Sequence, residues 1–135
     1  MKYVDVNVFV YWLGDDAVFG DEATAIVKRI ERGERAATSA ITPWLIHVVL
    51  GGLGRNYDEE KMVARMGELG FLRMEPLMWE DYQTALKCMH LYRLDLEDAL
   101  HLAVSQRLGI REMYTNDGDF SKTPVKLVGF KRLTR

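Results

Sequence analysis

The sequence contains little cysteine and no long apolar run, and each shortage excludes a class of protein. Cys88 is the only cysteine, so the chain cannot form an internal disulfide and is not a disulfide-stabilised scaffold. We interpret Cys88 as a small buried apolar residue. No segment approaches the roughly 20 continuous apolar residues that cross a bilayer, and Asp5 interrupts the stretch where a signal peptide would be apolar. We therefore expect a cytoplasmic protein with no membrane association.

The chain also lacks a strong net charge and any linker-like segment. Its formal charge of −2 offers no general attraction to nucleic acid, so a polyanion would have to be held by a local basic patch or by a bound metal. We find no internal repeat and no segment rich in proline, glycine or serine. With 135 residues, of which 48% are apolar, the chain is long enough to bury one sizeable core. We expect a single domain over residues 1–135.

What the sequence does contain is an alternation of short β-prone runs and amphipathic helical patterns. Strands are expected at residues 2–6, 36–39, 71–74, 113–115 and 126–128. Helices are expected at residues 8–13, 21–32, 42–50, 57–69, 79–92 and 96–108. In the third of these helices we expect Thr42 as the N-cap and Pro43 as the first helical residue. The alternation predicts an α/β fold, a three-layer α/β/α sandwich around a mostly parallel central sheet.

Three short acidic motifs lie at the boundaries of these elements. They are Asp5-Val6-Asn7, Glu97-Asp98-Ala99-Leu100-His101 and Thr115-Asn116-Asp117-Gly118-Asp119-Phe120. Ligands of a parallel sheet bind beyond the carboxyl ends of its strands, where the fold lets Asp5, Asp98 and Asp117 meet. Converging carboxylates repel one another unless a hard divalent cation lies between them. Because such a cation activates water for phosphodiester hydrolysis, the motifs predict a metal-dependent phosphodiesterase.

Each of these acids also has a purely local explanation. Asp5 can simply end a strand, Asp117 can begin an ordinary turn, and Asp98 can be a capping-box acid beneath the N-cap Asp95. The cluster is the better interpretation because three separate local roles would otherwise have to coincide. The histidines have no paired metal-ligand spacing, and we interpret all three as structural: His47, His90 and His101.

The motifs together resemble a known family. The run Tyr3-Val4-Asp5-Val6-Asn7-Val8-Phe9-Val10-Tyr11, the run Asp98-Ala99-Leu100-His101-Leu102-Ala103 and the motif at residues 115–120 look like those of the PIN domain. They are most similar to the single-domain, VapC-type toxin ribonucleases of prokaryotic toxin–antitoxin pairs. The resemblance covers essentially the whole chain. It implies a PIN-like sandwich and metal-dependent endoribonuclease activity on RNA, with Mg²⁺ or Mn²⁺ as the cofactor.

Carried onto this chain, the resemblance assigns roles to individual residues. Asp5, Asp98 and Asp117 match the family's first, third and fourth acids, and we expect them to be both catalytic and metal-binding. We expect Asp5 and Asp98 to be the principal ligands, with Asp117 completing the site or positioning water. The residues that match the family's supporting positions are Asn7, Asn116 and Asp119.

The resemblance also implies partners. It implies an RNA substrate, a homodimer and a small cognate antitoxin, which lays an apolar helix in a groove and sends a basic side chain into the acidic site. RNA phosphates would be held by basic residues near the cleft. Our candidates are Lys2, Arg55, Lys122, Lys126, Lys131, Arg132 and Arg135.

One family acid is missing. The family's second acid normally lies three residues after the start of the helix at residue 42, and Leu45 occupies that position. No carboxylate occurs between Glu34 and Asp58. Three explanations remain open: a weakly active or inactive relative, a site that uses His47 to anchor water, or a change introduced or selected because an active toxin harms its host.

Two further classes compete with the nuclease. A phosphatase with a nucleophilic Asp after the first strand needs a second acid two residues later, where this chain has Asn7. A receiver-like phosphoacceptor needs paired acids in the same place, which Asp5-Val6-Asn7 does not provide. The remaining alternative is a catalytically weakened or inactive PIN domain that binds RNA or its antitoxin without cleavage, and Leu45 favours it.

Overall fold

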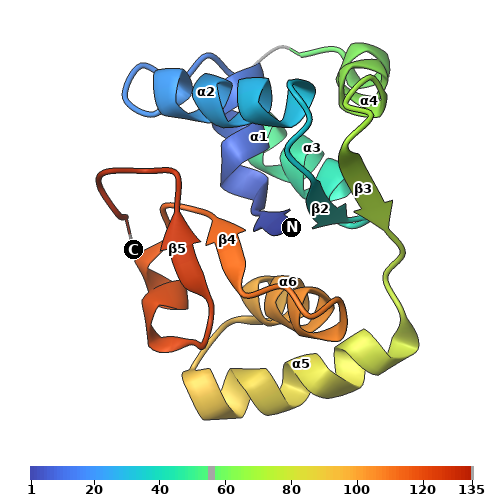
Figure 1. The fold of residues 1–135 in the computed structure, drawn as a ribbon, viewed down its shortest axis with the longest axis vertical. Helices are drawn as coiled ribbons and strands as arrows, with labels where there is room; N and C mark the ends of the chain where they lie inside the picture. The colour runs from blue at the N-terminus through green and yellow to red at the C-terminus, as the bar shows by residue number, and fades with distance from the viewer. Residues whose placement is uncertain (55–56, 135) are drawn as a thin grey trace.

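The computed structural model describes residues 1–54 and 57–134, which form alternating strands and helices (Figure 1). The strands are β1 (Lys2–Val4), β2 (Ala36–Ser39), β3 (Leu72–Glu75), β4 (Glu112–Tyr114) and β5 (Lys126–Val128). The helices are α1 (Val6–Leu13), α2 (Gly20–Glu31), α3 (Thr42–Gly52), α4 (Glu59–Gly67), α5 (Trp79–Tyr92) and α6 (Leu96–Arg107). A 3₁₀ helix, η1 (Gly118–Lys122), lies between β4 and β5.

The strands form one sheet in the order β3-β2-β1-β4-β5, and every neighbouring pair is parallel. Strand β1 lies at the centre, where Tyr3 pairs with Ala37 of β2 on one side and Met113 of β4 on the other. The predicted α/β sandwich is therefore confirmed, with a sheet that is wholly rather than mostly parallel. Because β1 and β4 are neighbours, the loops that follow them lie at the same edge of the sheet.

Helices cover both faces of the sheet, as Figure 1 shows. Helices α1 to α4 cover one face, and their apolar side chains form one core cluster with Val4 and Tyr114 of the sheet. Helices α5 and α6 cover the other face, and their cluster includes Tyr3 and Met113. Alternate residues of a strand point to opposite faces, so β1 and β4 each contribute to both cores. Cys88 belongs to the second cluster, with 4% of its surface exposed, as its apolar interpretation predicts.

Two local expectations need correction. The first strand ends at Val4, because Asp5 already acts as the N-cap of α1 and accepts a hydrogen bond from the Val6 N–H. Thr42 is not the N-cap of α3, a position that Ile41 occupies. The Thr42 hydroxyl is instead buried against Thr38, at 2.8 Å between the two Oγ1 atoms. A hydrogen bond to the end of β2 thus replaces the capping role that the sequence favours, and the Thr38 hydroxyl itself donates to the Val4 carbonyl of β1 at 2.9 Å.

Helix α6 is joined to the end of β3 and the start of α5 through Arg107. Its guanidinium donates to Glu75 at 2.6 Å and to Asp81 at 2.8 and 3.0 Å. The hydrogen bond from Arg107 holds the pKa of Glu75 below its usual range. Burial raises the pKa of Asp81, but the hydrogen bonds from Arg107 and the Met78 N–H outweigh it, so this pKa is lowered too. Both carboxylates are therefore charged and compensated in the folded chain.

Among the described residues, no helix combines the length and apolar character that a bilayer crossing requires.

Candidate metal centre

A cleft of about 250 Å³ opens where β1 and β4 end, between α1, α3, α6 and η1. Most of its lining side chains are acids: Asp5, Asp95, Glu97, Asp98, Asp117 and Asp119. The remaining lining residues are Val6, Asn7, Leu45, Val49 and His101. Within the described part of the chain, no lysine or arginine forms an ion pair with any of these acids. The cleft therefore gathers acids that no described lysine or arginine neutralises through an ion pair.

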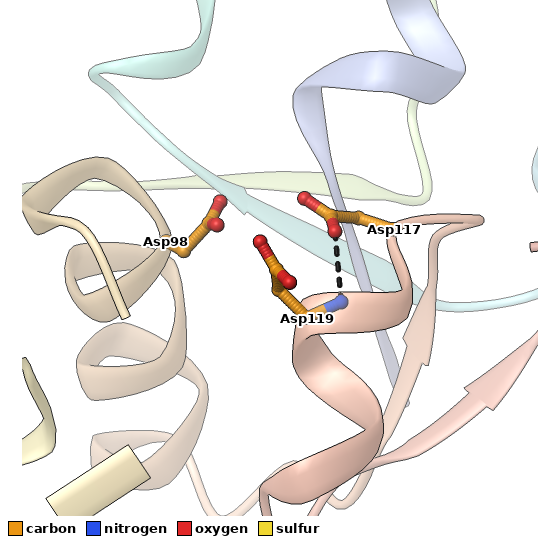
Figure 2. Close-up of side chains that lie close together, drawn as sticks. All are labelled: Asp98, Asp117 and Asp119. Atoms are coloured by element: carbon orange, nitrogen blue, oxygen red, sulfur yellow. Dashed lines mark hydrogen bonds between the residues drawn. The ribbon is translucent and has the colours of Figure 1, made fainter. Parts of the chain in front are cut away.

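Asp98 reaches the cleft from the first turn of α6. The side chain of Asp95 is the N-cap and accepts a hydrogen bond from the Asp98 N–H at 2.9 Å, so Asp98 is the third residue of the helix, as predicted. This cap fixes the backbone at Asp98 and leaves its carboxylate to point toward η1 (Figure 2). The capping residue is thus Asp95, and the Asp98 side chain is available for another role.

Asp117 and Asp119 meet Asp98 from the opposite side. Asp117 is the N-cap of η1 and accepts a hydrogen bond from the Asp119 N–H at 2.9 Å, drawn as the dashed line in Figure 2. One carboxylate oxygen from each of Asp98, Asp117 and Asp119 lies within 4.8 Å of the others. Three oxygens at such separations suit a hard cation, which prefers carboxylate and water ligands. Asp119, expected only as a supporting residue, therefore joins the trio directly.

Asp5 lies in the same cleft but is held differently. Its Oδ1 accepts from the Val6 N–H at 2.8 Å, and its Oδ2 accepts from the Thr115 hydroxyl at 2.7 Å. The same hydroxyl accepts a hydrogen bond from the Asp117 N–H at 3.0 Å, so Thr115 couples Asp5 to Asp117. Asp5 is not part of the trio found among the described residues. Each of its oxygens keeps a second acceptor site that can face a cation or a water molecule.

The proton affinities of these acids reflect their crowding. Burial raises the pKa of Asp5 to about 6; the Thr115 hydrogen bond opposes this rise and the charge of Asp117 adds to it. Burial and the charge of Asp95 raise the pKa of Asp98 to about 8. Burial likewise raises the pKa of Asp117, and the charge of Asp119 adds to the effect. A carboxyl group resists ionisation where like charges gather, and a bound cation would reverse that balance.

The two predicted asparagines support the cleft from behind its acids. Asn7 lines the cleft, and its Nδ2 lies 3.5 Å from the Asn116 Oδ1. Asn116 is fully buried and does not line the cleft; its Nδ2 donates to the Tyr11 hydroxyl at 2.9 Å. These contacts tie the start of α1 to the segment that carries Asp117. The asparagines therefore fix the relative positions of the acid-bearing elements.

Leu45 and Val49 form an apolar wall on the α3 side of the cleft. They lie one helical turn apart and both line it, and Leu45 is only 2% exposed. His47 does not line the cleft, because its ring lies on the exposed side of α3 against Glu59 and Tyr57. The suggestion that His47 anchors water in the site is therefore wrong. Apart from Asp5 at the start of α1, the carboxylates of the cleft lie at the starts of α6 and η1.

Three residues in or behind the cleft have no functional role in the sequence prediction. Asp95 and His101 line the cleft but are interpreted as a capping and a structural residue, and Thr115, which holds Asp5 from behind, has no predicted role. The spacing of His101, three residues after Asp98 on one helix face, is the one signal that pointed to the cleft. Of the basic candidates, Arg55 and Arg135 lie outside the described residues, and none of the others lines the cleft. The charge of Lys122 nevertheless acts on Asp117, because it opposes part of the rise in the pKa of that carboxyl.

A profile of the PIN domain matches residues 2–126 of this sequence. The chain belongs to the PIN-domain family. No curated protein matched it in sequence.

The trio and Asp5 together provide the oxygen-rich, electronegative donor set that a divalent cation requires, so the residues present fit such an ion.

Solved structures share the fold at low sequence identity. VapC20 of Mycobacterium tuberculosis, described as a toxin that cleaves the sarcin-ricin loop, is 18% identical with a TM-score of 0.78, covering 96% of this chain and 100% of its own. A toxin–antitoxin complex from Klebsiella pneumoniae is 21% identical with a TM-score of 0.70, covering 95% and 96%. VapBC2 of Rickettsia felis, solved with a DNA fragment from its promoter, is 16% identical with a TM-score of 0.63, covering 95% and 98%. The structural neighbours of this PIN domain thus include VapC toxins of toxin–antitoxin pairs.

Proposed function

We propose that this PIN domain, acting as a single unit over residues 1–135, is a metal-dependent endoribonuclease of the VapC type. The observation that carries the proposal is the convergence of Asp98, Asp117 and Asp119 in an acidic cleft with no ion pair to a described lysine or arginine. A structural role alone does not explain such a cluster, because each added carboxylate opposes folding. The membership in the PIN family and the VapC fold of the neighbours support the choice of a phosphodiester in RNA as the substrate.

The role of each acid in the proposed reaction follows from its contacts. A divalent cation, Mg²⁺ or Mn²⁺, would supply the positive charge that phosphodiester hydrolysis needs at the attacked phosphate. Asp98, Asp117 and Asp119 would hold it, with Asp5 beside them. Asp5 is oriented by two hydrogen bonds, and each of its oxygens keeps a second acceptor site that can take a proton from water. Thr115 fixes the positions of Asp5 and Asp117 relative to each other, because its hydroxyl donates to the Asp5 carboxylate and accepts from the Asp117 N–H.

Leu45 favours a second candidate function. It places a buried apolar side chain in the cleft wall where the PIN resemblance expects a carboxylate. Without that oxygen ligand a cation would be held less tightly, and the domain would then bind RNA or an antitoxin without cleaving. We favour the nuclease because Asp119 brings a third carboxylate to the site from η1.

A cleavage assay distinguishes the two functions. A pool of structured RNAs is incubated with Mg²⁺, Mn²⁺ or EDTA and the wild type, Asp98→Asn, Leu45→Glu or Leu45→Gln. Metal-dependent cleavage by the wild type that Asp98→Asn abolishes supports the nuclease, and the matched purification of that variant excludes a contaminating ribonuclease. Cleavage by Leu45→Glu alone, with Leu45→Gln inactive, establishes a disabled site. Silence from every protein would contradict the nuclease.

We also propose a cognate antitoxin and a homodimer as partners. One structural neighbour is described as a toxin–antitoxin complex, and another is the VapBC2 assembly bound to a DNA fragment from its promoter. This chain exposes large apolar side chains that such partners bury, among them Trp44 on α3 and Trp79 on α5, which are 62% and 75% exposed. Light scattering of the purified chain measures its oligomeric state. Co-purification with the product of a neighbouring short reading frame tests for the antitoxin, and a basic antitoxin side chain in the cleft would inhibit cleavage.

A further inference from the structure

His101 lies in the wall of the acidic cleft, one helical turn after Asp98. It is only 1% exposed, yet it lines the cleft alongside the acids. Residues three apart on a helix share one face, so the imidazole and the Asp98 carboxylate are presented to the same space. The proposed nuclease mechanism does not yet use this ring.

We assign the ring proton of His101 to Nε2 from a buried hydrogen-bond chain. The Ser39 N–H donates to the Tyr3 hydroxyl oxygen at 3.1 Å, and that hydroxyl lies 2.6 Å from the His101 Nδ1. Tyr3 is fully buried, so its O–H proton requires an acceptor, and the Nδ1 lone pair provides it. With Nδ1 as acceptor, the neutral imidazole carries its proton on Nε2. Burial lowers the pKa of His101 to about 4, which keeps the ring neutral near pH 7.

The Nε2–H has no partner of its own. The Nε2 atom is buried and forms no hydrogen bond with any described residue. Leaving a buried donor unpaired costs about 1–3 kcal/mol, so such atoms are rare unless something outside the chain satisfies them. A neutral donor also suits an acidic cleft, because it offers a hydrogen bond without competing with a cation for the carboxylates, as a lysine or arginine would.

We propose that His101 is a positioning residue whose Nε2–H donates a hydrogen bond to an oxygen brought into the cleft by its ligands. That oxygen belongs either to a water molecule held by the divalent cation or to a phosphate of the RNA. The proposal rests on the proposed nuclease function. Tyr3 acts behind His101, since its hydroxyl sets the tautomer and holds the ring in place. In this arrangement the chain Ser39–Tyr3–His101 links the end of β2 to the reacting groups.

The test is an NMR measurement of the histidine side chains in the ¹⁵N-labelled protein. In EDTA we expect His101 in the tautomer with the proton on Nε2. On addition of Mg²⁺ alone, a shift of its Nε2–H resonance identifies a metal-held water as the acceptor. A shift only after a non-cleavable oligoribonucleotide is added identifies a phosphate. His90 lies exposed on α5 and serves as the internal control whose resonances should not move.

Calorimetry with Mg²⁺ on the same sample separates the possible failures. If the wild type binds Mg²⁺ and the His101 resonances do not move with Mg²⁺ or with RNA, the positioning role is refuted while the nuclease stands. A proton found on Nδ1 refutes it as well. If calorimetry shows that the wild type binds neither Mg²⁺ nor Mn²⁺, the proposed nuclease and this proposal fail together.

Two variants add a functional readout. Gln at position 101 can present an N–H near the place of Nε2, whereas Leu of similar bulk cannot. If the oxygen is a metal-held water, we expect His101→Leu to weaken Mg²⁺ binding by about tenfold and His101→Gln to restore most of it. If it is a phosphate, the same contrast is expected in KM for RNA. Equal behaviour of the two variants would show that the ring only fills space, and the NMR result decides the matter even if His101→Leu fails to fold.

Discussion

Replacing Asp98 with Asn should stabilise the metal-free protein while it abolishes metal binding. The pKa of this carboxyl is raised to about 8 by burial and neighbouring acids, whereas its value in an unfolded chain is near 4. At pH 7.5 the unfolded state therefore releases a proton that the folded state retains, and this difference opposes folding. At pH 4 the carboxyl is protonated in the folded state and about half protonated in the unfolded chain, so little of the opposition remains. The penalty thus grows as pH rises from about 4 to about 8.

The magnitude follows from the same values. Each tenfold change in proton affinity corresponds to about 1.4 kcal/mol, so the full difference at pH 7.5 is about 5 kcal/mol. Asp98 is only partly buried, and solvent screening reduces this to about 1–2 kcal/mol. For a chain of this length we expect Asp98→Asn to unfold about 3–8 °C above the wild type in EDTA at pH 7.5. At pH 4 we expect only a small fraction of this difference.

Thermal unfolding followed by circular dichroism, in EDTA and in Mg²⁺, measures both effects. Mg²⁺ at one hundred times its dissociation constant should stabilise the wild type by about 2.7 kcal/mol and leave Asp98→Asn unchanged. Asp21→Asn is the matched control, because Asp21 is exposed in the first turn of α2 and lies outside the cleft. If Asp98→Asn unfolds no later than the wild type at pH 7.5, or gains as much at pH 4, the reasoning from repulsion is refuted.

Three further perturbations test the frame around the site. Arg107→Met should lower the free energy of unfolding by about 3 kcal/mol near pH 7, because it leaves the buried carboxylates of Glu75 and Asp81 uncompensated. This loss should shrink in acid, where the two carboxylates protonate. Urea unfolding near pH 7 and in acid measures it. Thr115→Val should remove a donor to Asp5 and raise its pKa further above about 6, shifting the acidic limb of the cleavage pH profile upward; an unchanged profile would contradict this coupling. Gly129→Ala should destabilise the fold by about 2 kcal/mol or more, since the new Cβ would lie 2.6 Å from the Tyr114 ring at a φ of +97°; a melting temperature equal to the wild type would refute it.

The fold was predictable because its signals are local. The period of the apolar residues determined where strands and helices occur, and the alternation of the two required a parallel sheet covered on both faces. The cap of α6 was equally readable, since Asp95 and Asp98 are three residues apart and interact through one helical turn. The Thr42 cap was predicted wrongly because its hydroxyl bonds to Thr38, four residues earlier, and the Thr38 hydroxyl in turn donates to the Val4 carbonyl of the neighbouring strand, a contact that capping rules do not include.

The candidate site divides in the same way. The sequence by itself determined that acids follow the central strands and begin α6, so that Asp5, Asp98 and Asp117 face one edge of the sheet. Only the tertiary structure decided that Asp119 joins Asp98 and Asp117, that Thr115 bridges Asp5 to Asp117 and that the His101 Nε2 is left unpaired. Chain periodicity gives the face on which a side chain lies. Which atoms come within hydrogen-bonding distance depends on how elements as far apart as residues 5 and 115 pack, and packing is a property of the whole fold.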